Sequence, residues 1–107
     1  VALWYAEQWP DLPSDAVVLD VRNADERNRW AIPDSTWIPL PELRDRLGEL
    51  PPGAPVYAYC RSGFRSYLAQ RILAQSGWPD AATLAGGELT FQAVLPAVAA
   101  DRELASA

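Results

Sequence analysis

The chain has 107 residues, a formal net charge of −5 and a hydrophobic content of 50%, which fits one globular domain and excludes a disordered chain. The acidic balance argues against nucleic acid and anionic membranes as partners, and no apolar run approaches the roughly 18 residues that a spanning helix needs. We therefore expect one cytoplasmic domain over residues 1–107, with its core over about 5–95 and a tail or linker over 96–107. The chain contains no methionine, which fits a domain excised from a longer chain.

Short apolar runs alternate with helical patterns, which is typical of an α/β domain with a mainly parallel sheet. In the first half, the expected elements are an edge strand near residues 2–5, a central strand over 17–21, a helix over about 24–30, a short strand at 37–38 and a helix over 42–50. Asn23 is of a favoured type for the start of the first helix, and acidic residues follow it in the first turn.

In the second half, the expected elements are a buried strand over 56–59, a helix over about 67–75 that Gly77 ends, a strand over 82–84 and a short helix after Gly86 and Gly87. The sheet is therefore expected to contain five strands. We expect the two adjacent glycines to break the chain for a turn, since this is commoner than packing of their backbone near the loop over residues 60–66.

The only cysteine, Cys60, lies where the strand over 56–59 ends and a helix begins. In open parallel sheets, ligands bind beyond the carboxyl ends of the strands, and the free N–H groups of a loop and of a helix start can hold an anion there. Arg61 and Arg65 flank the cysteine. Helix starts and neighbouring arginines both favour the thiolate form, so we expect Cys60 to be a reactive thiolate.

The alternative is that Cys60 is a small buried hydrophobic residue, as most intracellular cysteines are. Three features argue against it. Gly63 permits a backbone turn that other residues resist, Ser66 is of a good helix-capping type, and a core position needs no flanking arginines. We favour the reactive cysteine.

The absence of histidine and of a second cysteine restricts the chemistry further. A Cys-His catalytic pair, a Cys-x-x-Cys redox pair and a cysteine zinc cluster are all excluded within this sequence. We therefore expect no metal site. A sulfur atom placed on Cys60 would need an external acceptor to remove it.

The run from Cys60 to Ser66, Cys-Arg-Ser-Gly-Phe-Arg-Ser, resembles the active-site loop of rhodanese-family sulfurtransferases. Other segments resemble further motifs of that family in the same order: Leu19-Asp20-Val21-Arg22 with Glu26, Ile32-Pro33-Asp34-Ser35, Ile38-Pro39-Leu40 and Leu84-Ala85-Gly86-Gly87. The resemblance covers about residues 17–91. The chain departs from the family at Ala31, where the family often has histidine, and at Phe91, where it often has tryptophan.

The resemblance implies a rhodanese-like three-layer α/β fold, with a mainly parallel five-stranded sheet flanked by helices. It also implies that Cys60 takes sulfane sulfur from thiosulfate, a polysulfide or a persulfide donor and passes it to a thiol or cyanide acceptor. The residues expected to bind the substrate and the persulfide are Arg61, Ser62, Gly63, Phe64, Arg65 and Ser66. No cofactor is implied for this domain.

A narrower resemblance concerns residues 38–47, 49–51 and 65–69, which are similar to the C-terminal rhodanese domain of coenzyme A disulfide or polysulfide reductases. It implies an N-terminal flavin-dependent disulfide reductase domain in the full-length chain, with FAD and NAD(P)H bound there. The present sequence has no Gly-x-Gly-x-x-Gly fingerprint for such a cofactor.

Asp20 and Arg22 lie at the carboxyl end of the central strand. They are therefore expected at the same sheet edge as Cys60, where they could support the pocket floor. The interpretation that we favour is structural. Arg22 then pairs with Glu26 at the start of the next helix in an exposed ion pair, and Asp20 has a structural role as well.

Two other functions stay open from the residues alone. Phosphatases and arsenate reductases of related fold use a Cys-x5-Arg loop for a tetrahedral oxyanion, whereas Arg65 follows Cys60 after four residues, which suits a single sulfur atom better. A non-catalytic rhodanese-like interaction module would keep the fold but usually lose the cysteine or distort its loop, and this chain has kept both.

Overall fold

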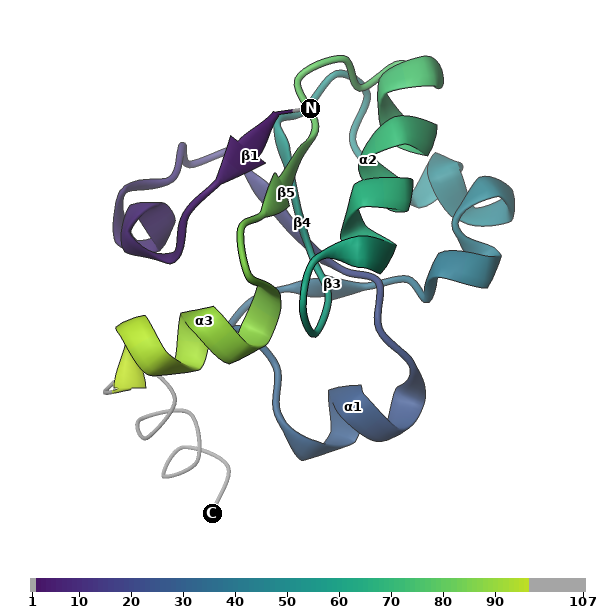
Figure 1. The fold of residues 1–107 in the computed structure, drawn as a ribbon. Helices are drawn as coiled ribbons and strands as arrows, with labels where there is room; N and C mark the ends of the chain where they lie inside the picture. Colours follow the sequence, from purple (N-terminus) through teal and green to yellow (C-terminus); the bar gives the residue numbers. More distant parts are fainter. Residues whose placement is uncertain (1, 97–107) are drawn as a thin grey trace.

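A single parallel sheet organises the fold. The computed structural model describes residues 2–96, and its five strands run in the order β1-β5-β4-β2-β3 (Figure 1). The strands are β1 (Leu3–Trp4), β2 (Val17–Asp20), β3 (Thr36–Trp37), β4 (Val56–Tyr59) and β5 (Ala82–Leu84). All four strand pairings are parallel. The expected α/β class with a mainly parallel five-stranded sheet is therefore confirmed.

Helical segments cover both faces of this sheet and make it the middle of three layers. They are the α-helices α1 (Ala24–Arg29), α2 (Phe64–Gln75) and α3 (Gly87–Val94), and the 3-10 helices η1 (Ala6–Asp11), η2 (Leu40–Glu42) and η3 (Arg44–Glu49). Along β4, Val56 and Ala58 enter one buried cluster with Leu73 of α2, whereas Tyr59 enters another with Phe91 of α3. Because successive strand side chains point to opposite faces, the sheet separates two cores.

Helix α1 begins as its sequence predicts. The Asn23 side chain accepts a hydrogen bond from the Glu26 N–H at 3.0 Å, and the Glu26 carboxylate accepts one from the Asn23 N–H at 3.1 Å. This reciprocal pair satisfies two backbone donors that a helix start leaves without partners. The short helix is thereby fixed directly after the end of β2.

Two expected helices differ from the structure. The helix expected over 42–50 is instead the pair of 3-10 helices η2 and η3, because this short segment lies between prolines and contains Gly48, which leaves few α-helical bonds to stabilise it. Helix α2 begins at Phe64, three residues before the expected start at residue 67, and Gly63 takes the position before its first turn.

Within residues 2–96, no helix is long and apolar enough to cross a membrane. The tail expected over 96–107 lies, apart from Pro96, outside the described residues. The expected N-terminal edge strand is present as β1, which pairs with β5.

Candidate active site

Cys60 follows β4 directly and lies at the bottom of the loop that leads into α2. It is 1% exposed, and its Sγ atom accepts a hydrogen bond from the Gly63 N–H at 3.1 Å. The Ser66 hydroxyl lies 3.5 Å from the same sulfur and donates to the Gly63 carbonyl at 3.1 Å. Ser66 also shares a hydrogen bond with Thr83 of β5. The loop therefore curls around the sulfur and is held against the sheet.

The turn depends on Gly63. Its φ of 124° lies in the region that side-chain-bearing residues rarely adopt, and it immediately precedes the first turn of α2. The first N–H groups of a helix have no acceptor within the helix, and the helix dipole adds partial positive charge there. The sulfur thus lies at a place that favours an anion.

Helix α3 holds the loop from the other side. The Glu88 N–H donates to the Cys60 carbonyl at 2.8 Å, and the Leu89 N–H donates to the Arg61 carbonyl at 3.3 Å. A Cβ atom on Gly87 would lie 2.4 Å from the Arg61 carbonyl oxygen and 2.6 Å from that of Cys60. The expectation that the glycine pair serves only a turn is therefore wrong for Gly87, since its backbone packs directly on the cysteine loop.

Arg65 is held by Glu26 of α1 through two hydrogen bonds of 2.6 and 2.8 Å, one to each carboxylate oxygen. Glu26 is 7% exposed. The hydrogen bonds from Arg65 outweigh the effect of burial and lower the pKa of the Glu26 carboxyl to about 2. The ion pair joins two segments that lie 39 residues apart in the sequence and fixes the second arginine of the loop.

The expected pairing of Arg22 with Glu26 is wrong. Arg22 is buried and binds both carboxylate oxygens of Asp20, at 2.9 and 2.8 Å, and the Trp30 carbonyl at 2.6 Å. Its Nη1 atom lies 2.8 Å from Glu88 Oε1, an ion pair whose angles fall outside hydrogen-bond geometry. The side chain lies in the interior, where the buried Asp20 carboxylate compensates its charge.

Burial opposes the charged form of Arg22, but the hydrogen bonds that it donates to Asp20 and the nearby negative charges prevail and raise its pKa. Asp20 and Arg22 therefore form a buried charged cluster that contacts Tyr59, the residue before Cys60, and Glu88, whose N–H donates to the Cys60 carbonyl. This long-range link to Glu88 has no local signal in the sequence, because the two partners lie in the first and last quarters of the chain.

The remaining predicted site residues lie around the loop opening. Arg61 and Ser62 are exposed, and Phe64 is 69% exposed at the start of α2. The structure thus brings Gly63 and Ser66 to the sulfur and leaves these three side chains toward solvent. Ser66 is in the first turn of α2 and not before it, so its hydroxyl serves the loop in place of the expected helix cap.

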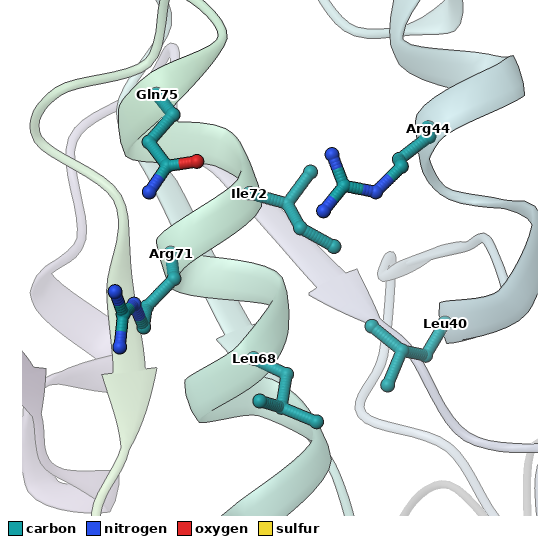
Figure 2. Close-up of a pocket in the computed structure, with 6 residues that line it drawn as sticks. All are labelled: Leu40, Arg44, Leu68, Arg71, Ile72 and Gln75. Carbon is teal, nitrogen blue, oxygen red and sulfur yellow. The ribbon is translucent and has the colours of Figure 1, made fainter.

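Two cavities differ in their relation to the loop. The larger, about 390 Å³, lies between α2 and the η2–η3 segment and is lined by Leu40, Arg44, Leu68, Arg71, Ile72 and Gln75 (Figure 2). It contains no residue of the cysteine loop. A smaller cavity of about 260 Å³ includes Arg61 of the loop together with residues of α1 and α3. Because it adjoins the cysteine loop, the smaller of these two cavities is the relevant one for chemistry at Cys60.

Known proteins resemble this chain in sequence and in fold. The chain matches the rhodanese-like domain family over residues 5–93. A sulfurtransferase of Allochromatium vinosum is 35% identical over 77 residues, covering 72% of each chain. The putative sulfur carrier protein YrkF of Bacillus subtilis is 33% identical over 78 residues, which cover 73% of this chain and 42% of that protein.

A solved structure is similar along most of the chain. The reduced CoADR-RHD of Bacillus anthracis superposes with a TM-score of 0.83 at 33% identity, covering 91% of this chain and 17% of that one. The present chain thus spans a small part of that protein and less than half of YrkF. The present chain contains the strand β4, the loop and the helix α2 that surround Cys60.

Proposed function

This chain belongs to the rhodanese family and is of the sulfurtransferase type, and from this premise we propose that it carries sulfane sulfur as a persulfide on Cys60. The Cys60 thiolate attacks the outer sulfur of thiosulfate or a polysulfide. A new bond forms between Sγ and that sulfur, and sulfite or the shortened polysulfide leaves with the electron pair of the broken bond. The resulting Cys60 persulfide is an anion.

An external nucleophile completes the cycle. A thiolate or cyanide attacks the outer sulfur, the bond from that sulfur to Sγ breaks, and its electron pair returns to Cys60 as a thiolate. The products are an acceptor persulfide or thiocyanate. Atoms and electrons balance in both steps without a redox cofactor.

The observation that carries this proposal is the 3.1 Å hydrogen bond from the Gly63 N–H to Cys60 Sγ at the start of α2. A backbone donor that is already directed at the sulfur needs no rearrangement to stabilise the charge of the persulfide. Arg65 is occupied by Glu26, so we assign it to fixing the loop. Arg61 is exposed, and we assign it to meeting the anionic donor.

The Arg65–Glu26 pair also favours sulfur transfer over phosphatase or arsenate reductase chemistry. An oxyanion would need the guanidinium that Glu26 holds at 2.6 and 2.8 Å, in addition to the wider loop that the sequence lacks. A non-catalytic module would not need the hydrogen bond to Sγ.

Thiocyanate formation from thiosulfate and cyanide tests the proposal. We expect the wild-type domain to turn over and Cys60→Ser to lose activity while keeping its thermal unfolding transition. Retained transfer in Cys60→Ser would contradict the persulfide, and hydrolysis of an aryl phosphate at a comparable rate would favour the phosphatase.

A fused partner is the second part of the proposal. Likeness to a CoADR-RHD structure that is far longer than this chain supports a role behind a flavin-dependent disulfide reductase domain, with FAD and NAD(P)H bound in that domain. Sequencing the genomic region upstream of this segment tests this directly, because a fused reductase would be encoded in the same reading frame.

A further inference from the structure

The smaller cavity lies against the cysteine loop and is built from three segments. Arg29 comes from the end of α1, Arg61 from the loop, and Glu88 and Leu89 from the first turn of α3, and Glu26 of α1 completes the charged lining. The volume is about 260 Å³. This is slightly below the range of about 300–1,000 Å³ that is typical of drug-sized ligands, so the cavity suits a small organic molecule.

The charges of this lining do not cancel. Glu26 pairs with Arg65. Glu88 and Asp20 share Arg22, and Asp20 has a second partner in Arg27, so these carboxylates are matched by nearby arginines. Within residues 2–96, neither Arg29 nor Arg61 has a carboxylate within ion-pair distance. The cavity is therefore locally cationic in a chain whose net charge is −5. Guanidinium groups bind carboxylates and phosphates through paired N–H donors.

We propose that this cavity binds the anionic group of a small thiol that accepts the sulfur, and that Arg29 is a specificity-determining residue for such acceptors. This inference rests on the proposed function. The acceptor thiolate attacks the outer sulfur of the Cys60 persulfide, while a carboxylate or phosphate elsewhere in the same molecule contacts Arg29. The cavity includes Arg61, the residue next to Cys60, so it lies beside the residue that would carry the persulfide.

The test is a series of small thiol acceptors that differ in charge: mercaptosuccinate with two carboxylates, 3-mercaptopropionate with one, and 2-mercaptoethanol with none. Turnover is measured with saturating thiosulfate for the wild type and Arg29→Gln. We expect Arg29→Gln to raise the KM for mercaptosuccinate about twofold to fivefold, as befits an exposed ion contact. Its kcat and its KM for 2-mercaptoethanol stay unchanged. Added salt should reduce the difference between the two proteins.

The matched control is Arg44→Gln, which removes the same charge from the exposed rim of the cavity in Figure 2. We expect it to leave all three KM values unchanged. The proposal is overturned if Arg29→Gln leaves the KM for mercaptosuccinate unchanged, if it affects the neutral thiol equally, or if Arg44→Gln has the same effect.

Failure of the underlying function is distinguishable from failure of this inference. The mass of the protein after thiosulfate alone, without any acceptor, reports whether Cys60 takes up sulfur. A wild-type protein that takes up no sulfur contradicts the proposed function itself. A protein that loads normally but shows no preference for charged thiols contradicts only the role of Arg29.

Discussion

At the scale of single residues, Glu26 has two tasks. It closes the start of α1 through Asn23 and holds Arg65 of the cysteine loop. The pKa of its carboxyl group is lowered to about 2 from the ordinary 4.5, and the largest cause is the pair of hydrogen bonds from Arg65. The ionised form is therefore stabilised in the folded protein, so its contribution to stability is fully present above pH 4.5 and is lost as the pH falls toward 2.

We predict that Glu26→Gln lowers the free energy of unfolding by about 1–2 kcal/mol at pH 7, since the partly buried ion pair becomes a neutral contact and Arg65 loses its anion. The difference from the wild type should shrink as the pH falls from 4.5 toward 2, the interval between the two pKa values. Urea unfolding of both proteins at several pH values measures this. A difference that stays constant over the interval would mean that the Glu26 carboxylate is not the group that titrates.

At the scale of elements, the contact between α3 and the cysteine loop positions the catalytic segment. Gly87 has a φ of 63° and no room for a Cβ, whereas Gly53 has a φ of 68° and nothing within 4 Å of its Cβ position. The two glycines share nearly the same positive φ and differ in their surroundings. Alanine at each therefore separates backbone strain from the close approach to Cys60 and Arg61.

We predict that Gly87→Ala destabilises the protein by about 1–3 kcal/mol more than Gly53→Ala does, because the new methyl group displaces the loop carbonyls. The rate at which iodoacetamide alkylates Cys60 should also change in Gly87→Ala and stay at the wild-type value in Gly53→Ala. Equal stability and equal alkylation rates in the two variants would show that α3 does not position the loop.

The elements also show which parts of the fold can be predicted from the sequence. Periodicity and capping predict all five strands and α1, because these signals are local. Arg22 shows the limit: local spacing selects Glu26 as its partner, whereas burial at the end of β2 directs it to Asp20 and to Glu88 of α3. Pairings between distant segments depend on how the layers pack, and the η2–η3 segment depends on the same packing, so neither follows from sequence spacing.

At the scale of the whole molecule, the parallel sheet brings the carboxyl ends of β2 and β4 to one edge, where α1 and α3 flank the turn into α2 (Figure 1). The motifs that follow β2 and β4 in the sequence therefore lie at the same edge of the sheet. The likeness to the rhodanese domain of coenzyme A disulfide reductases is confirmed by the CoADR-RHD structure. A single domain over residues 1–107 stays a prediction, as do the roles assigned to the loop residues.

The central claim is that Cys60 carries a sulfur atom, and the intact mass of the purified domain tests it most directly. The protein is exposed to thiosulfate or polysulfide and measured before and after a thiol reductant is added. We predict a gain of one sulfur mass per chain that the reductant reverses and that Cys60→Ser does not show. No adduct with any sulfane donor, in a protein whose Cys60 is still alkylated by iodoacetamide, would contradict the account.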